Sequence, residues 1–397
     1  MAAHEVLVDL ALIFVAAKLT GALFRRLGQP PVVGELLAGV LIGPHALGLI
    51  EVSEATEVLA EIGAILLLFA VGLDTPLSDL KAVGTRSLAV GVGGIVIPFL
   101  AGAGLLMVLG NPTNEALFMG TAMVATSVGV TARVLHDLGV VGHPASRVVL
   151  GAAVVDDILG LLLLAVVAGA ATGQLSAGSV VVLAVLAITF VVLVGGLGPS
   201  LVARAEPLLD RLGRRGVFTL ALGFCLVLSA IAGVLQLAAI IGAFLAGMAF
   251  AETHERYGLE AQVQPVYALL VPFFFVITGA HVDLAVLTDP GTLSLLALVT
   301  VVAIVGKLIG GGLAALPMGR RNAAIVGTGM VPRGEVGILV ASIGLAQGVI
   351  ENDLYAVVVG MSILTTLVAP PVLKALFGGS AAEERDHQRT PEIEGLD

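Results

Sequence analysis

The sequence contains little charge, few aromatic residues and a single cysteine, and each shortage excludes a class of protein. Only 12% of its 397 residues are charged and 58% are hydrophobic, whereas about 25% of the residues in soluble domains are charged. Too few polar residues are present to cover a soluble fold. The lone Cys225 cannot form an intrachain disulfide, which excludes a disulfide-stapled scaffold. The formal charge of −10 comes without a basic patch of interleaved aromatics, so nucleic acid is not an expected partner.

Long hydrophobic runs fill almost the whole chain, as expected of an integral membrane protein. A helix that crosses a bilayer needs about 20 mostly apolar residues, and the sequence contains thirteen runs of roughly this length. We predict an all-α polytopic membrane protein with 13 transmembrane helices within residues 1–379, followed by an acidic, disordered cytoplasmic tail over 380–397. The predicted spans are 6–24, 30–49, 57–73, 87–109, 115–132, 148–171, 179–202, 217–235, 237–251, 263–280, 292–316, 323–346 and 353–376.

The basic residues predict how the chain is oriented, because Lys and Arg are enriched in cytoplasmic loops. If the N-terminus is outside, the inner loops and the C-terminal segment hold sixteen of the 19 Lys and Arg residues, and the outer loops hold none. The other three, Lys18, Lys307 and Arg333, fall inside predicted spans. We therefore expect an external N-terminus and a cytoplasmic C-terminus.

Three short motifs recur at nearly one spacing along the chain. The matching pairs are Gly34–Gly39 with Gly242–Gly247 at an offset of 208 residues, and Phe69–Gly72 with Val276–Gly279 and Gly120–Val124 with Gly327–Val331 at an offset of 207. Each offset passes over seven predicted spans, an odd number, so the two halves would lie upside down relative to each other. Inverted repeats of this kind are typical of secondary transporters that work by alternating access.

The third pair of motifs is followed in each half by residues that disfavour a regular helix. Thr126 and Ser127 stand in one half, and Pro332 and Gly334 stand at the equivalent place in the other. Hydroxyls that bond back to helix carbonyls and a simple proline kink would explain either site alone. Interrupted backbone at membrane depth survives only where it is buried or lines a cavity. The equivalent positions favour two discontinuous helices that cross.

Ionisable residues inside the membrane are functional candidates, because each costs about 2.5–3.5 kcal/mol or more. Asp156 and Asp157 lie in the sixth span. Adjacent residues of a helix point about 100° apart, so the two carboxylates face different neighbours and cannot form a symmetric dyad. One can line a cavity while the other pairs with a cation, for which Lys307 in the eleventh span is the expected partner. A purely structural salt bridge would not explain the second aspartate.

The remaining buried charges are expected to have structural roles. Arg333 and Glu335 lie at the predicted break and are expected to pair with other buried groups and to cap broken helix ends, or Glu335 could reach Lys307. Glu35 is expected to pair with a cation such as Arg333 or to lie at a cavity mouth. The histidines show no metal-ligand spacing, so no cofactor is expected.

Several of these motifs together resemble the cation/proton antiporter superfamily, most closely the electrogenic bacterial Na⁺/H⁺ antiporters of the NapA type with the NhaA-like fold. The motifs are Ala152–Gly160, Thr126 with Ser127, Gly306 with Lys307, and Pro332–Gly337. The resemblance implies a moving core (87–171 and 292–376), a dimerisation panel (6–73 and 217–280) and a linking span (179–202). The paired aspartates with a lysine separate this branch from electroneutral relatives with Asn-Asp and from Kef-type potassium systems with Gln-Asp.

The resemblance also implies a function. A homodimer in the inner (plasma) membrane would exchange internal Na⁺ or Li⁺ for external H⁺, electrogenically and with two H⁺ per Na⁺. Asp157 would be the main Na⁺ ligand, helped by Asp156, Thr126 and Ser127, and Lys307 would carry the second proton. A K⁺/H⁺ antiporter is the alternative. A cation channel would need a filter lined by carbonyls, and an enzyme would need a nucleophile with a base or a metal triad, and the sequence shows none of these.

Overall fold

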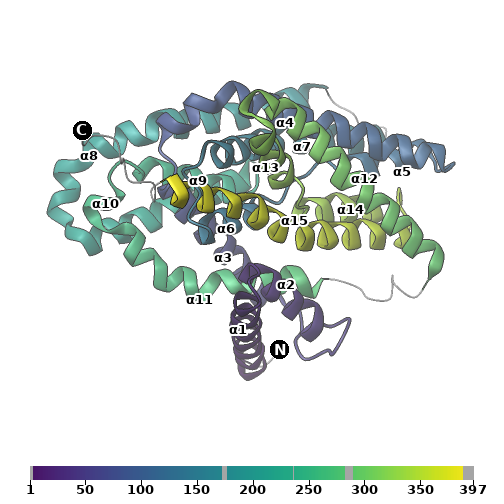
Figure 1. Cartoon of the computed structure of the whole chain (residues 1–397), viewed down its shortest axis with the longest axis horizontal. Helices are drawn as coiled ribbons and strands as arrows, with labels where there is room; N and C mark the ends of the chain where they lie inside the picture. Colours follow the sequence, from purple (N-terminus) through teal and green to yellow (C-terminus); the bar gives the residue numbers. More distant parts are fainter. Residues whose placement is uncertain (1–2, 172–176, 236, 282–288, 388–397) are drawn as a thin grey trace, which may run out of the picture.

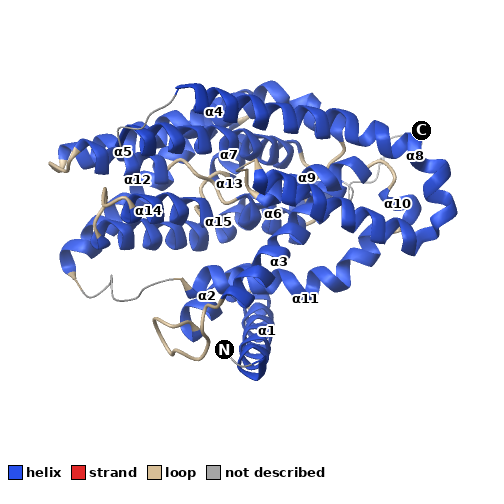
Figure 2. Ribbon diagram, turned by 180° about the vertical axis from the view of Figure 1, so that it is seen from behind, coloured by secondary structure: helices blue, strands red, loops and turns tan. Residues whose placement is uncertain are grey.

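The computed structural model describes residues 3–171, 177–235, 237–281 and 289–387, and every regular element in these ranges is a helix (Figure 2). The first half contains α1 (Ala3–Arg26), α2 (Pro31–Ile42), α3 (Glu54–Leu73), α4 (Leu77–Val108), α5 (Thr113–Ala122), α6 (Val128–Asp137) and α7 (Pro144–Ala171). The second contains α8 (Ala177–Val234), α9 (Ala239–Phe250), α10 (His254–Tyr257), α11 (Leu259–Ala280), α12 (Pro290–Ala315), the 3₁₀ turn η2 (Leu316–Met318), α13 (Arg320–Gly329), α14 (Glu335–Ala346) and α15 (Asn352–His387).

About half of these helices have the length and composition of membrane spans, which confirms the predicted all-α membrane fold. Among the described residues, 8 helices are long and apolar enough to cross a bilayer, and Pro31–Ile42, Ala239–Phe250 and Val336–Leu345 are shorter apolar helices. One of the long helices, α8, comprises two helices joined at a kink, because Gly213 inside it has a φ of 66° and a ψ of 172°. The count of thirteen spans stays a prediction.

Both predicted helix breaks are present, and they lie against each other. The backbone leaves the helical conformation between α5 and α6 and again between α13 and α14. Across the two breaks the Ser127 N–H donates to the Pro332 carbonyl at 2.7 Å, and the Thr131 hydroxyl donates to the Gly329 carbonyl at 2.7 Å. These contacts satisfy backbone groups that a helix would otherwise pair within itself. The crossing of the two broken helices stays a prediction.

The motifs that repeat in the sequence also meet in space. Gly39 of α2 and Gly279 of α11 each lie so close to the other helix that a Cβ atom would overlap its backbone, and the same holds for Gly72 of α3 and Gly247 of α9. In the sequence repeat, Gly39 is equivalent to Gly247 and Gly72 to Gly279. Reciprocal contacts of this kind are what a two-fold relation between the halves produces, and small residues allow the close approach of membrane helices.

A separate apolar cluster lies within the segments expected to form the core. It joins α4, α5, α7, α12, α14 and α15 through buried side chains that include Phe118, Leu164, Val299 and Met361. In Figure 1 the helices of this cluster occupy the centre and right, whereas α8, α10 and α11 extend to the left and α1 projects below. The division into core, panel and linker stays a prediction.

Candidate ion-binding site

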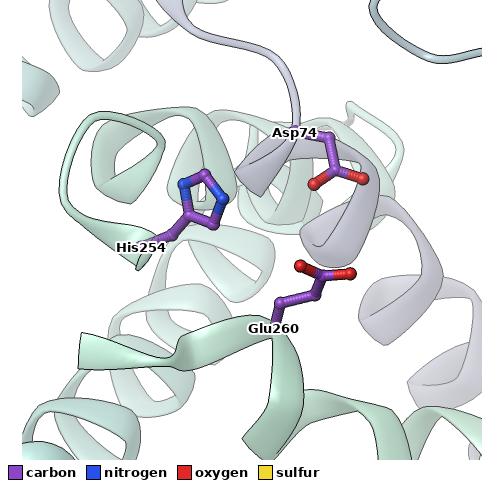
Figure 3. A group of neighbouring side chains, drawn as sticks. All are labelled: Asp74, His254 and Glu260. Carbon is purple, nitrogen blue, oxygen red and sulfur yellow. The ribbon is translucent and has the colours of Figure 1, made fainter. Parts of the chain in front are cut away.

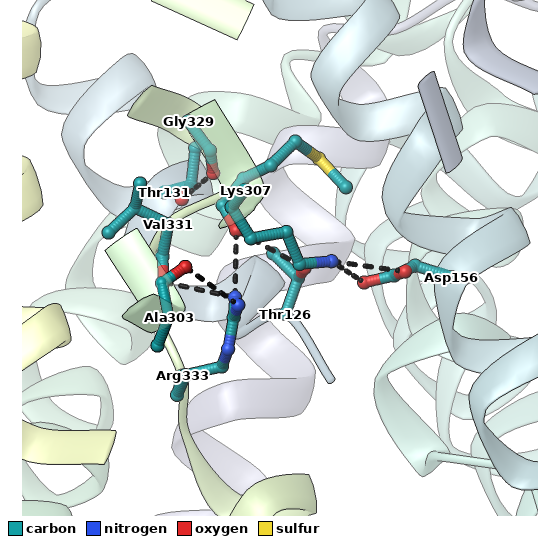
Figure 4. Close-up of polar contacts among 9 residues, drawn as sticks. Thr126, Thr131, Asp156, Ala303, Lys307, Gly329, Val331 and Arg333 are labelled. Atoms are coloured by element: carbon teal, nitrogen blue, oxygen red, sulfur yellow. Dashed lines mark hydrogen bonds and ion pairs between the residues drawn. The ribbon is translucent and has the colours of Figure 1, made fainter. Parts of the chain in front are cut away.

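The centre of the candidate site is a buried ion pair between α7 and α12. The Lys307 ammonium donates to both carboxylate oxygens of Asp156, at 2.9 and 3.2 Å, and both side chains are fully buried (Figure 4). Removing one partner of such a pair would leave an uncompensated charge in the protein interior. The structure therefore contains the partnership that the sequence predicted for these two residues.

Asp157 faces a different environment from its neighbour, as the helical rotation requires. Its side chain is 7% exposed and lines a cavity of about 1050 Å³. The cavity extends toward the beginning of α3 (Glu57, Glu61) and the end of α11 (Thr278, His281). Asp157 is therefore a carboxylate that water and small cations can reach.

Access to Asp157 is one-sided. Its other neighbouring pocket, lined by apolar residues such as Leu68, Val128 and Phe244, has a volume of only about 10 Å³. A cavity needs about 10–15 Å³ to hold even one water molecule. The pathway is thus wide on one side of Asp157 and closed on the other.

Thr126 and Ser127 lie at the break between α5 and α6, where the sequence placed them. Both are buried, and the Thr126 hydroxyl donates to the Met330 carbonyl at 3.4 Å. The Ser127 hydroxyl oxygen has no hydrogen-bond partner among the described residues, and a Cβ atom at Gly334 would overlap it. Neither residue lines the large cavity beside Asp157, so the structure shows them at the contact between the two breaks.

Arg333 is fully buried and covers carbonyl groups at the interrupted helix. Its guanidinium donates to the Met330 and Val331 carbonyls at 3.0 and 3.1 Å and to the Ala303 carbonyl at 3.5 Å (Figure 4). These contacts are the helix-end capping expected of it. Glu335 begins α14, but its side chain lies outside the described parts of the structure, and with it the predicted contacts of Glu335.

Glu35 pairs with a residue that the sequence reasoning missed. Its carboxylate is 3.6 Å from the guanidinium of Arg133, whereas the expected pairing with Arg333 is not seen. The predicted fifth span, 115–132, ends just before Arg133, because a charged residue interrupts the apolar run, and Arg133 is thereby expected in a cytoplasmic loop. The helix in fact continues to Asp137, which accepts a hydrogen bond from Arg133 at 2.8 Å. The signal in the sequence is that Arg133 follows the break by fewer than two helical turns.

A second cluster lies at the opposite end of α3 from the large cavity. Asp74, His254 and Glu260 face one another, and one ligand atom from each lies within 4.8 Å of the others (Figure 3). Burial raises the pKa of the Asp74 carboxyl, and the Glu260 carboxylate adds to the rise. The 20 residues of α3 cover about 30 Å, so this cluster lies far from the end of the large cavity that Glu57 lines. Sequence spacing could not reveal it, because Asp74 is far along the chain from His254 and Glu260.

Comparison with known proteins agrees with this geometry. The family described as "Sodium/hydrogen exchanger, transmembrane" matches residues 12–378. The high-affinity Na⁺/H⁺ antiporter NhaS3 of Synechocystis sp. is 37% identical, over 97% of this chain and 93% of that protein. The Na⁺/H⁺-K⁺ antiporter GerN of Bacillus cereus is 38% identical, over 94% and 97%. The solved structure of the sodium proton antiporter MjNhaP1 from Methanocaldococcus jannaschii shares the fold, with a TM-score of 0.66, 18% identity and coverage of 96% and 99%. The chain belongs to the sodium/hydrogen exchanger family of membrane antiporters.

Proposed function

We propose that this protein exchanges internal Na⁺ or Li⁺ for external H⁺ by alternating access, with two H⁺ moved per Na⁺. The observation that carries the proposal is that the two aspartates have different surroundings. Asp157 lines a large cavity that lies on one side of it. Asp156, the preceding residue, forms an ion pair with Lys307 at 2.9 Å. Asp157, which can bind a cation or a proton, thus lies beside Lys307, a second group that can lose a proton.

Competition at Asp157 accounts for the exchange. A small hard cation such as Na⁺ prefers oxygen ligands, and a carboxylate can hold either the cation or a proton but not both. The empty, negatively charged site would be costly to move past the apolar residues that close its other side. Only the loaded forms cross, so each outward movement of Na⁺ must be followed by an inward movement of H⁺.

Lys307 supplies the second proton of the cycle. Na⁺ that approaches Asp157 adds positive charge close to the buried ammonium and draws the Asp156 carboxylate toward itself, which weakens the ion pair. Lys307 then releases its proton along with the one from Asp157. Two protons leave for each Na⁺ that binds, and the exchange moves one net charge.

The predicted topology places the large cavity on the outer side of the inner (plasma) membrane, because the beginning of α3 and the end of α11 adjoin loops without Lys or Arg. The reciprocal glycine contacts support two inverted halves.

We further propose a homodimer formed by 6–73 and 217–280. Apolar side chains exposed along α1, such as Leu7 and Leu19, support this arrangement because they need a lipid or protein neighbour.

A K⁺/H⁺ antiporter is the second candidate, favoured by the relative GerN, whose name includes K⁺. Purified protein in liposomes with an imposed pH gradient separates the candidates. We expect added Na⁺ or Li⁺ to dissipate the gradient saturably, and K⁺ to do so weakly. A larger response to K⁺ would favour the alternative, and cation flux without proton movement would contradict antiport altogether.

A further inference from the structure

The closed side of Asp157 is sealed by apolar packing with a charged contact next to it. The pocket of about 10 Å³ includes Val128, the first residue of α6, and Val154 of α7. Further along α6, Arg133 is 8% exposed and lies against α2 and α11. In the predicted topology this is the cytoplasmic side, opposite the large cavity.

The contacts of Arg133 fall into two sets. Asp137, on the same helix, accepts a hydrogen bond at 2.8 Å and fixes the orientation of the guanidinium. The other contacts cross to neighbouring helices. They are the Glu35 carboxylate of α2 at 3.6 Å, and the rings of Tyr267 and Phe275 of α11 at 5.2 and 5.8 Å. Arg133 therefore connects α6, within the predicted core, to two helices of the predicted panel.

Some polar atoms at this contact are left without partners. Glu35 and Tyr267 are only 3% and 4% exposed, yet one Glu35 carboxylate oxygen and the Tyr267 hydroxyl have no hydrogen-bond partner among the described residues. Buried polar atoms without partners weaken the closed arrangement, because separation of the helices would return them to water. The contact is thus attractive through charge and cation–π interactions, yet it is not fully satisfied and can open.

We propose that Arg133, Glu35 and Tyr267 form the cytoplasmic gate of the exchanger. The proposal rests on the proposed function, since it takes α6 as part of the moving core and α2 and α11 as part of the panel. For Asp157 to meet the cytoplasm, α6 must separate from α2 and α11, so the Arg133–Glu35 pair must break once in each cycle. Arg133 is a positioning residue that acts on the balance between the two states and does not bind the transported ion.

Accessibility of introduced cysteines tests the gate without relying on transport. In a Cys225→Ala background, Val154→Cys reports on the closed pocket and Ser342→Cys on the large cavity. A membrane-impermeant maleimide is applied to the cytoplasmic face for the first reporter and to the outer face for the second. We expect Arg133→Gln and Glu35→Gln each to raise labelling of Val154→Cys about tenfold, equivalent to about 1.4 kcal/mol, and to lower labelling of Ser342→Cys. The charge exchange Arg133→Glu with Glu35→Arg should bring both rates back toward the original.

Arg256→Gln is the matched control. Arg256 also bridges helices, through Asp210 at 2.7 Å and Glu206 at 3.2 Å, but on the exposed surface between α8 and α10. We expect it to change neither labelling rate. If Arg133→Gln does not fold, Arg133→Lys keeps the charge but loses the planar stacking on the rings, and a smaller rise in Val154→Cys labelling is expected.

The outcomes separate this proposal from the proposed function. Unchanged rates in the Arg133 and Glu35 variants would overturn the gate, even in a protein that exchanges Na⁺ for H⁺. Opposite shifts of the two reporters would support the gate, whatever ion the protein carries. Equal rises at both reporters would also overturn it, because they would indicate general loosening of the structure.

Discussion

At the scale of single residues, two neighbours in one helix have different surroundings because of the direction in which each points. Asp156 contacts Lys307, and Asp157 lines the cavity. The rotation of about 100° between adjacent helical residues keeps the two carboxylates from sharing a proton. The Asp156 charge is thereby compensated by Lys307, while the Asp157 carboxylate borders the cavity.

Asp157→Asn tests the carboxylate that lines the cavity. The amide has nearly the same shape but cannot lose a proton or neutralise a cation, so we expect coupled Na⁺/H⁺ exchange in proteoliposomes to be abolished. Folding and membrane insertion should be unchanged, as judged by the yield of monodisperse protein. Full Na⁺ transport driven by a pH gradient in this variant would refute the central role of Asp157.

Asp74 should make stability depend on pH. Asp74 is the C-cap residue of α3, so its carboxyl lies near a helix end where the dipole disfavours negative charge. Burial raises the pKa of this carboxyl above the unfolded value. The folded state therefore holds the proton more tightly, and stability falls as the pH rises from about 4 through the raised pKa. We expect Asp74→Asn to stabilise the protein by up to about 1 kcal/mol at neutral pH and to have no such effect at the lowest pH. Thermal unfolding can be followed by thiol labelling of Cys225, which is buried.

Asp289 provides a control of opposite sign for this measurement. It caps the N-terminus of α12, and hydrogen bonds from Thr292 lower its pKa. Its stabilising effect is present above its unfolded pKa and is lost as the pH falls through the lowered one. Asp289→Asn should therefore leave the protein less stable at neutral pH. The same direction of change in both variants would show that the two pKa shifts do not control the pH dependence.

At the scale of helices, the close packing between the two halves of the repeat depends on residues without side chains. A Cβ atom at Gly39 would overlap the Val276 carbonyl of α11. We expect Gly39→Ala to force α2 and α11 apart and to lower the yield of folded protein severely. Gly104→Ala in α4 is the control, since nothing lies within 4 Å of its Cβ position. It should be neutral or stabilise by about 0.5–1 kcal/mol, and equal losses in the two variants would contradict the packing argument.

The sequence predicted the features of the helices that arise locally and missed those that depend on tertiary contacts. Apolar runs, the breaks at Ser127 and Pro332, and the Asp156–Lys307 pair follow from hydropathy, helix propensity and the cost of a buried charge. The hydropathy pattern predicts that the fifth span ends before Arg133. Hydropathy does not take into account that Glu35 and Asp137 compensate the charge of Arg133 inside the protein. Partner choice for Glu35 required the path of α2 relative to α6, which no local pattern contains.

At the scale of the whole molecule, the charge moved per cycle determines what drives transport. With two H⁺ per Na⁺, one net charge crosses the membrane in each cycle, and the membrane potential contributes about 2.3 kcal/mol per 100 mV. At zero voltage, a tenfold Na⁺ gradient would be balanced by about half a pH unit rather than one, since each tenfold ratio is worth about 1.4 kcal/mol. The conditions of zero flux in proteoliposomes therefore report the stoichiometry directly.

Lys307→Gln should change this balance while leaving the cation site in place. The amide can still donate a hydrogen bond to Asp156, but it carries no titrating proton, so only the proton of Asp157 remains to be exchanged. If the variant folds, we expect Na⁺/H⁺ exchange with little or no current, and zero flux when the pH gradient equals the Na⁺ gradient. Because the substitution leaves Asp156 without its buried counter-charge, a lower melting temperature is also expected. Currents recorded on supported proteoliposome membranes test whether Lys307 carries the second proton. Undiminished current per Na⁺ transported in the variant would mean that another group carries it and that Lys307 is a purely structural partner of Asp156.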